Sequence, residues 1–286
     1  MTTLLVDIDE VLYKICFRHE KKIYSILNTR LKRKLPVEFE YKKDAVEYMG
    51  DDPDGILDLV FEMEIGTLDQ CKQSLNEYVE WLREAARADD VLFCYGSGLN
   101  FREAVATILP YKGNRPSTKP VMFNHLLAYI KEAHYVHEMD GIETDDVLGI
   151  MQTKAPEGTT IILSQDKDLR MIPGKYLDKK GKVQTISELE GMRNFFCQML
   201  TGDKAVDNIP GLYGYGPKKV HKLLDGCESA QEMHEVVRAE YASYQTKPPA
   251  KSVLPRTGPQ GIEPIMQEIG DLLWIRRYEQ TYWTAW

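Results

Sequence analysis

Short apolar runs alternate with segments of helical periodicity along roughly the first 190 residues of the chain. Leu4–Val6, Val91–Phe93 and Thr160–Leu163 have the length of buried strands, and Tyr135–His137 is a weaker candidate for another. Between these runs, apolar residues recur every three or four positions, which predicts helices over about 11–33, 75–86 and 123–130. Strands that alternate with helices predict an α/β fold with a mainly parallel central sheet flanked by helices.

Beyond about residue 187 the pattern becomes mostly helical. Residues 247–264 hold five of the fourteen prolines, so we expect a loop there, followed by a helix with Ile265, Ile269 and Leu272 on one face. The tail contains three of the four tryptophans. We therefore expect an α/β core over 1–186, a helical part over 187–246, and a loop, a helix and an aromatic tail over 247–286.

The composition is that of a globular protein, with 43% hydrophobic and 28% charged residues. No apolar run approaches the ~20 residues that span a bilayer, and the N-terminus lacks the pattern of a signal peptide. The five cysteines are odd in number and show no CxxC spacing, which predicts free thiols in a reducing compartment. We expect a cytoplasmic protein without membrane contact, in the host cytoplasm if the chain is viral, and a monomer.

The net charge of −8 argues against nucleic-acid binding at first sight, because phosphate contacts need Lys and Arg. Nine carboxylates, however, fall in four tight groups, and without them the chain would carry a charge of +1. These groups are Asp7 and Asp9; Glu143, Asp145 and Asp146; Asp166 and Asp168; and Asp203 and Asp207. If the nine share one site, the remaining surface need not repel DNA.

Three of the acidic groups stand where a predicted strand ends or the next helix begins. Because parallel strands place their carboxyl ends at one edge of the sheet, we expect these groups to meet there. Each group alone is also compatible with ordinary helix capping. Like charges spaced as Glu143 and Asp146, or as Asp166 and Asp168, repel one another, however, and call for a cation. Oxygen ligands without His or Cys favour Mg²⁺ or Mn²⁺, and so many carboxylates suggest two ions.

Two further segments carry basic residues or glycines in a compact arrangement. Arg102, Lys112 and Arg115 lie in a stretch suited to phosphate recognition, although a solvated loop would have the same composition. The second segment spaces three glycines before a basic helix start, which predicts a helix–turn–helix hairpin able to approach a DNA phosphate or a monovalent cation. Its candidate residues are Gly211, Gly214, Gly216, Lys218, Lys219 and Lys222. A plain turn between two helices is the alternative.

Five motifs in order resemble those of the 5′-nuclease superfamily, the flap endonucleases and 5′-to-3′ exonucleases, particularly of the bacteriophage type. They are LLVDID (4–9), FR…YKGNR (101–115), ETDD (143–146), SQDKD (164–168) and TGDKAVDNIPGLYGYGPKKV (201–220). The resemblance implies a PIN-like fold with a helix–three-turn–helix hairpin in the C-terminal part. It also implies a metal-dependent nuclease that cuts DNA near 5′ ends, during phage DNA replication or degradation.

The resemblance further implies a role for each matching residue. Asp7, Glu143, Asp145 and Asp166 would hold a first Mg²⁺ or Mn²⁺ ion; Asp146, Asp168, Asp203 and Asp207 would hold a second; and Asp9 is a further candidate. Lys112 and Arg102 match the basic pair that contacts the reacting phosphate. The segment Gly211–Lys219 matches the hairpin that grips duplex DNA, with the carbonyls of Gly214 and Gly216 around K⁺.

Two departures from the family pattern bear on the substrate and on the metal site. The family places an Asp seven residues before the Arg of FR, where this chain has Tyr95, so one ligand is absent and Asp9 is a candidate replacement. The segment that corresponds to the helical arch of flap endonucleases, about 111–141, is short, which fits an exonuclease better. Duplexes with a 5′ end, a nick or a flap are the expected substrates, with RNA–DNA hybrids as a further candidate.

The expected mechanism needs no nucleophilic side chain. One metal ion lowers the pKa of a bound water that attacks phosphorus, and the other stabilises the departing 3′-oxygen, leaving a 5′-phosphate. Asp145 and Asp166 would hold the ions, while Lys112 and Arg102 would neutralise charge that develops on the phosphate.

Other functions remain open from the sequence. Asp7-Ile8-Asp9-Glu10-Val11 resembles the signature of haloacid-dehalogenase-like phosphatases, in which Asp7 would be a nucleophile and Asp9 an acid or base. That interpretation leaves YKGNR and the glycine hairpin unexplained. A DNA-binding replication accessory that has lost its chemistry is supported only by Tyr95. A small PIN-type ribonuclease would share the acidic cleft but lacks the hairpin and the length.

Overall fold

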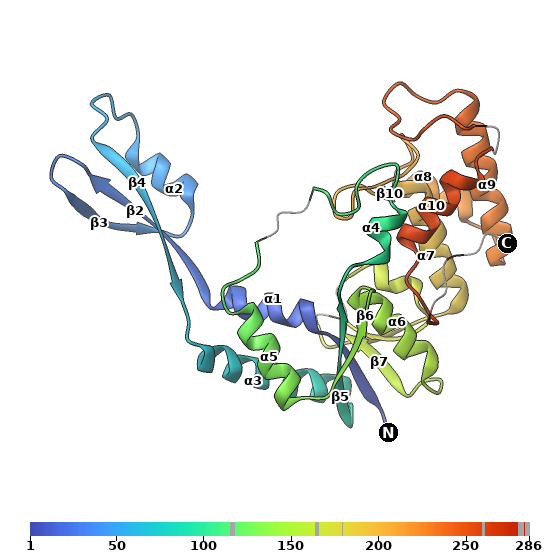
Figure 1. The fold of residues 1–286 in the computed structure, drawn as a ribbon, viewed down its shortest axis with the longest axis horizontal. Helices are drawn as coiled ribbons and strands as arrows, with labels where there is room; N and C mark the ends of the chain where they lie inside the picture. The colour runs from blue at the N-terminus through green and yellow to red at the C-terminus, as the bar shows by residue number, and fades with distance from the viewer. Residues whose placement is uncertain (115–117, 164–165, 179, 259–260, 280–282, 284–286) are drawn as a thin grey trace. The chain divides into compact units, whose positions relative to one another are not determined.

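A computed structural model describes the chain except residues 115–117, 164–165, 179, 259–260, 280–282 and 284–286 (Figure 1). The chain divides into two compact units. The first consists of Met1–Ile8, Glu80–Ser117 and His134–Trp286, and the second of Asp9–Val79 and Thr118–Ala133. This division does not follow the boundaries expected from composition, because segments far apart in the sequence join to form each unit.

The first unit is built on a six-stranded sheet, and its strand order is β6-β5-β1-β7-β8-β9. Neighbouring strands are parallel except for β8 and β9, which are antiparallel. The strands are β1 (Thr3–Asp7), β5 (Asp90–Ser97), β6 (Val136–Asp140), β7 (Thr160–Leu163), β8 (Gly174–Leu177) and β9 (Val183–Ile186). The four short apolar runs are thus β1, β5, β6 and β7. The predicted α/β fold with a mainly parallel sheet is confirmed.

Helices pack against this sheet, and the helices that follow it in the sequence extend the unit (Figure 1). The helix α6 packs against β1 and β5, and α7 packs against α8, α9 and α10. The described helices of this unit are α4 (Phe101–Val105), α6 (Thr144–Lys154), a short 3₁₀ helix (Asp168–Met171), α7 (Glu188–Thr201), α8 (Pro217–Leu224), α9 (Ala230–Thr246) and α10 (Glu263–Leu273). From Glu188 onward the described elements are mainly helices.

The core of the helical part is rich in large apolar side chains. Phe195 and Phe196 of α7 are fully buried, and Tyr241 of α9 donates its hydroxyl to the Met199 carbonyl at 2.6 Å. A buried aromatic side chain removes roughly 150–250 Å² from water, so these residues dominate the stability of the helical part. Trp283, also buried, lies 5.7 Å from the Phe195 ring, which makes the aromatic tail part of the core at this position.

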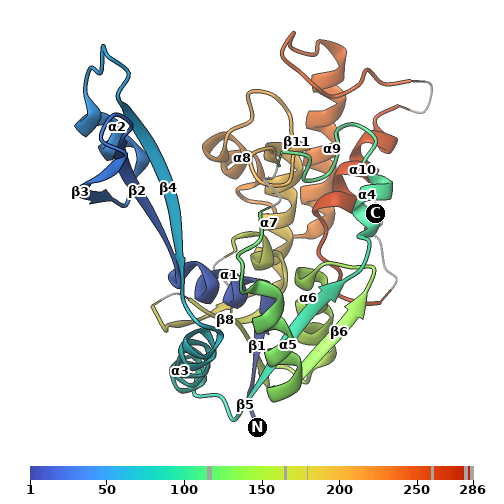
Figure 2. The ribbon, with the colours of Figure 1, turned by 60° about the vertical axis from the view of Figure 1, so that its left-hand side comes forward.

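The second unit contains a small antiparallel sheet in the strand order β3-β2-β4. The sheet consists of β2 (Glu20–Asn28), β3 (Arg33–Phe39) and β4 (Leu57–Ile65), with α2 (Lys42–Met49) against it (Figure 2). The remaining helices are α1 (Ile8–Arg18), α3 (Leu68–Ala86) and α5 (Phe123–Ala133), of which α1 and α3 each begin or end in the other unit. The long helix predicted over 11–33 is therefore wrong beyond Arg18, since β2 pairs with β4 over nine residues and this distant partner overrides local helical spacing.

The five cysteines are free thiols, as expected. Within the part of the chain that the structure describes, no helix is long and apolar enough to cross a bilayer.

Candidate active site

The first group of carboxylates lies at the carboxyl edge of the large sheet. Asp7 is the last residue of β1, Glu143 and Asp145 stand at the start of α6, and Asp166 follows β7. Burial, and then the negative charges of Asp7, Glu143 and Asp166, raise the pKa of Asp145 well above its usual value, while Lys112 opposes the shift. The charge of Asp145 is therefore poorly compensated by the protein.

A second group of carboxylates lies beside the first. Asp168 opens the 3₁₀ helix, and its backbone N–H donates to Asp166 Oδ1 at 2.8 Å. Burial, followed by the charges of Asp166 and Asp203, raises the pKa of Asp168 from 3.8 to about 6 despite the nearby Lys167. The Nζ of Lys167 lies 3.0 Å from Asp203 Oδ2 and 3.3 Å from Asp168 Oδ1. Asp166 thus belongs to both groups.

Lys112 and Tyr111 enter the first group from the loop after α4. Lys112 Nζ donates to Glu143 Oε1, and the Tyr111 hydroxyl lies 2.8 Å from Glu143 Oε2 and 3.1 Å from Asp207 Oδ2. A phenol has one proton, so Tyr111 donates to one of these carboxylates at a time. Burial and the charge of Glu143 raise the pKa of Tyr111, which keeps it a neutral donor.

This arrangement changes the expected place of one ligand. The family resemblance implies that Asp207 binds the second ion together with Asp203. In the structure, the Asp207 side chain instead contacts the Tyr111 hydroxyl, which also contacts Glu143 of the first group. The backbone N–H of Lys112 also donates to the Asp207 carbonyl at 2.9 Å. Sequence reasoning missed Tyr111, and its position directly before Lys112 was the available signal.

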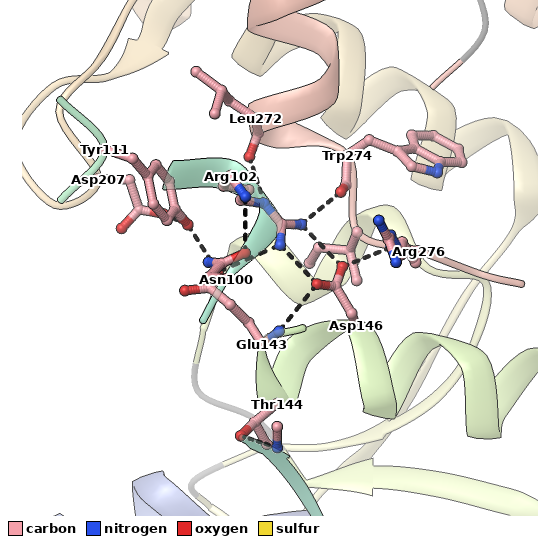
Figure 3. Close-up of polar contacts among 12 residues, drawn as sticks. Asn100, Arg102, Tyr111, Glu143, Thr144, Asp146, Asp207, Leu272, Trp274 and Arg276 are labelled. Atoms are coloured by element: carbon pink, nitrogen blue, oxygen red, sulfur yellow. Dashed lines mark hydrogen bonds and ion pairs between the residues drawn. The ribbon is translucent and has the colours of Figure 1, made fainter. Parts of the chain in front are cut away.

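Arg102 and Asp146 form a buried ion pair (Figure 3). Arg102 Nη1 and Nη2 donate to Asp146 Oδ2 and Oδ1 at 2.6 and 2.9 Å, and the two side chains are 2% and 0% exposed. Burial alone would raise the pKa of Asp146, but the charge and hydrogen bonds of Arg102 outweigh it and lower the pKa. The expected phosphate contact of Arg102 and metal contact of Asp146 are therefore corrected, because each side chain is enclosed with the other.

The structure places two other residues considered above, and a third lies outside the described part of the chain. Asp9 lies in the first turn of α1 and belongs to the second unit. Tyr95 lies in β5, one residue beyond Cys94, which is in register with Asp7 of β1. Arg115 lies outside the described residues.

The glycine hairpin forms the turn between α7 and α8. A Cβ at Gly211 would lie 2.3 Å from the Thr201 carbonyl oxygen, so this glycine is required by close backbone packing. Gly214 has a φ of 88°, and Gly216 is the N-cap of α8. Lys218, Lys219 and Lys222 are exposed on α8. A cavity of about 410 Å³ lies against the hairpin, and Lys204 and Lys251 line it.

The donor set of the two acidic groups consists of carboxylate oxygens, which suits Mg²⁺ or Mn²⁺. Among the described residues, no three Asp, Glu, His or Cys side chains are already placed at coordinating distance from a common point. Lys112 and Lys167 lie among the carboxylates and supply positive charge there.

Comparison with known proteins relates this chain to enzymes of DNA metabolism. No model of a protein family matches the chain. The DNA polymerase I of Rhizobium leguminosarum is 31% identical over 154 residues, which are 46% of this chain and 15% of that protein. The DNA polymerase I of Geobacillus stearothermophilus is 33% identical over 138 residues, 41% of this chain and 16% of that protein. The chain thus matches less than a fifth of the length of either relative.

A solved structure resembles nearly the whole chain. It is the flap endonuclease of bacteriophage T5 in a pseudo-enzyme–product complex with DNA and metal ions, with a TM-score of 0.50 at 13% sequence identity. The similarity covers 96% of this chain and 86% of that one. At this identity the likeness establishes the fold, and the local sequence matches to DNA polymerase I are independent of it. The chain therefore shares its fold with a bacteriophage flap endonuclease and part of its sequence with DNA polymerase I, in keeping with the resemblance that its motifs carry.

Proposed function

We propose that this protein is a divalent-metal-dependent 5′ nuclease that hydrolyses DNA phosphodiester bonds near 5′ ends. The observation that carries the proposal is the meeting of Asp7, Glu143, Asp145 and Asp166 at the carboxyl edge of the sheet, where burial and then repulsion by the other three carboxylates raise the pKa of Asp145. Carboxylates that repel one another destabilise the fold unless they bind a cation or a proton. The flap endonuclease of similar fold was solved with DNA and metal ions, which supports a metal ion over a proton.

The acidic groups divide into two candidate ion sites. Asp7, Glu143, Asp145 and Asp166 would hold one Mg²⁺ or Mn²⁺, and Asp166, Asp168 and Asp203 would hold the other. Asp207, which shares Tyr111 with Glu143, would support the first site. When bound, such ions would supply a water of lowered pKa and positive charge for the departing 3′-oxygen, as an in-line displacement that leaves a 5′-phosphate requires.

The chain's own cations and donors then act on the substrate. Lys112 forms an ion pair with Glu143 of the first group, which orients its Nζ. A positive charge fixed there is suited to neutralise the non-bridging oxygens of the phosphate as charge develops. The neutral hydroxyl of Tyr111 is a hydrogen-bond donor that keeps Glu143 and Asp207 together without adding charge.

DNA would be held outside the acidic groups, by the glycine hairpin and by α8. The exposed Lys218, Lys219 and Lys222 offer phosphate contacts, and the backbone near Gly214 and Gly216 is open enough for a strand or for a K⁺ ion. Contacts of this kind recognise backbone shape and not base sequence. We therefore infer a monomer that acts on duplexes with a 5′ end, nick or flap, and on RNA–DNA hybrids if the 2′-hydroxyls are tolerated. Such an activity would serve phage DNA replication or degradation.

Cleavage of labelled duplexes tests the proposal. Blunt, nicked and flapped substrates with a 5′ label are incubated with and without Mg²⁺, and we expect short 5′-terminal products only when Mg²⁺ is present. Replacing both acids, Asp166→Asn and Asp168→Asn, should abolish cleavage while DNA binding survives. Asp178→Asn, at a half-buried aspartate between β8 and β9, is the matched control and should cleave normally.

The same experiment separates the alternatives. Hydrolysis of p-nitrophenyl phosphate without DNA cleavage would favour a phosphatase that uses Asp7 as nucleophile. DNA binding without cleavage in either Mg²⁺ or Mn²⁺ would favour a binding accessory. Full activity of the Asp166 and Asp168 double variant would contradict the roles proposed for both residues.

A further inference from the structure

The end of α10 and the residues that follow it, 272–277, run past α4 and α6 and are here called the C-terminal strap. Its backbone meets the buried ion pair (Figure 3). Arg102 Nε donates to the Leu272 carbonyl at 3.0 Å, and Arg102 Nη2 donates to the Trp274 carbonyl at 2.7 Å. The backbone N–H of Arg276 donates to Asp146 Oδ1 at 2.9 Å. Three hydrogen bonds thus join the strap to residues at least 130 positions earlier in the chain.

The guanidinium of Arg102 has an acceptor on each side. Asp146 accepts two of its hydrogen bonds, and the Leu272 and Trp274 carbonyls accept two more. Nη1 also lies 3.6 Å from Glu143 Oε2. A guanidinium has five N–H donors in a fixed plane, and the four hydrogen bonds use four of them.

Asp146 connects this ion pair to the first group of carboxylates. Its Oδ2 accepts from the backbone N–H of Glu143 at 3.2 Å, so the same carboxylate holds Arg102, the strap and the N-cap of α6. Glu143 then presents its own carboxylate to Tyr111 and Lys112. Asp145 lies between Glu143 and Asp146, so any rotation of this turn moves it as well.

The strap also touches α6 directly, one turn after Asp146. A Cβ added to Gly149 would lie 2.4 Å from the Arg276 carbonyl oxygen, so any larger residue there pushes the strap away. On its other side, Arg277 Nη2 donates to the Met171 carbonyl at 2.7 Å. Ile275, Arg276 and Arg277 are all less than 10% exposed, and the strap is therefore fixed along its length.

We propose that the C-terminal strap, Arg102 and Asp146 form a positioning joint that fixes Glu143 and Asp145 for divalent-ion binding. The strap acts on the ions through this joint and touches neither the ions nor DNA. The inference rests on the proposed function, because it assumes that these carboxylates hold a metal ion. In this proposal Arg102 and Asp146 orient the metal ligands and contact neither phosphate nor metal.

The variant Gly149→Ala tests the joint from outside the acidic pocket. Alanine is a better helix former than glycine, so a loss of function arises from the displaced strap and not from a weakened α6. We expect Mn²⁺ binding, measured by electron paramagnetic resonance of the free ion, to weaken about tenfold, as is typical when the support of a metal ligand is lost. DNA affinity without divalent ions should stay within about twofold of wild type, since the joint contains none of the α8 lysines proposed to contact phosphate. The matched control is Gly258→Ala, where an added Cβ meets no atom within 4 Å.

Two further variants separate positioning from folding. Arg102→Lys keeps the charge but loses the planar fork, and should weaken Mn²⁺ binding in a folded protein. The double variant Arg102→Met with Asp146→Leu removes the ion pair without leaving a buried charge, so its thermal midpoint should recover relative to Asp146→Leu alone. Its Mn²⁺ binding should stay weak, because the Glu143 N–H has lost its acceptor.

The outcomes are distinct. The positioning role would be overturned if folded Gly149→Ala and Arg102→Lys bound Mn²⁺ with wild-type affinity. It would also be overturned if the double variant recovered both its thermal midpoint and its Mn²⁺ affinity. If Gly149→Ala fails to fold, the Arg102→Lys and double variants decide by the same criteria. Absence of Mn²⁺ binding by the wild-type protein would instead overturn the proposed function, and this inference with it.

Discussion

The substitution Asp168→Asn should stabilise the metal-free protein, and the effect should depend on pH. Asp168 is 17% exposed and faces Asp166 and Asp203, which together with burial raise its pKa from 3.8 to about 6. Asparagine keeps the shape and one acceptor oxygen for Gln198 and Lys167, which contact Oδ1 of the aspartate. The substitution therefore removes the negative charge with little change in packing.

The sign follows from proton linkage. Because the pKa of Asp168 is higher in the folded than in the unfolded chain, the folded state binds more protons between about pH 4 and 6, and stability falls as pH rises through that window. One pKa unit is worth about 1.4 kcal/mol, so the rise from 3.8 to about 6 corresponds to about 3 kcal/mol. The full penalty is present above about pH 7 and absent below about pH 4.

Urea unfolding in EDTA at several pH values measures this effect. We expect Asp168→Asn to exceed wild type by about 3 kcal/mol at pH 7.5 and to match it at about pH 4. Asp178→Asn is the control of opposite sign, because the N–H groups of Lys182 and Lys180 lower the pKa of Asp178, and its ionised form stabilises the fold as pH rises. Equal unfolding free energies of Asp168→Asn and wild type across the whole range would refute the repulsion described for the second acidic group.

Three further changes test other parts of the structure. Tyr111→Phe should lower the free energy of unfolding without metal by about 1–2 kcal/mol, because Glu143 and Asp207 lose their shared donor; urea unfolding measures this, and an unchanged value would contradict the bridge. Replacing Lys218, Lys219 and Lys222 by Gln should flatten the salt dependence of duplex binding by a slope of up to about 3, and an unchanged slope in fluorescence anisotropy would place DNA elsewhere. Gly270→Ala should cost about 1–3 kcal/mol, since the new Cβ would lie 2.0 Å from Trp283 Cε3; a wild-type thermal midpoint would show that Trp283 does not pack there.

Four of the six strands of the central sheet were predictable because they are short apolar runs, whereas β8 and β9 were not predicted. Thr160–Leu163 is β7 to the residue, and Asp7 ends β1 as expected. The rule that parallel strands end at one edge then predicts that Asp7, Glu143, Asp145 and Asp166 lie in one region. These predictions needed only local patterns and a topological rule.

The small sheet of the second unit was not predictable in this way. Residues 20–28 have apolar positions that fit a helix as well as a strand, and the choice is made by pairing with β4, whose partners lie up to 45 positions away. Local periodicity cannot decide such cases, because strand stability depends on cross-strand neighbours.

The interior of the site shows the same limit. Arg102 and Asp146 both matched family motifs, and the motifs could not reveal that the two side chains pair with each other. The pair is completed by carbonyls at Leu272 and Trp274, which carry no side-chain signal in the sequence. Tyr111 was likewise missed, because its role depends on two carboxylates 32 and 96 positions away.

The number of Mn²⁺ ions bound per chain is the most direct test of the central claim that the acidic groups exist to hold divalent cations. Titration of the wild-type protein, followed by electron paramagnetic resonance, should reach saturation at about two ions. Asp145→Asn should remove the ion of the first group and Asp168→Asn that of the second, each in a folded protein. Absence of saturable Mn²⁺ binding by the folded wild-type chain would contradict the account.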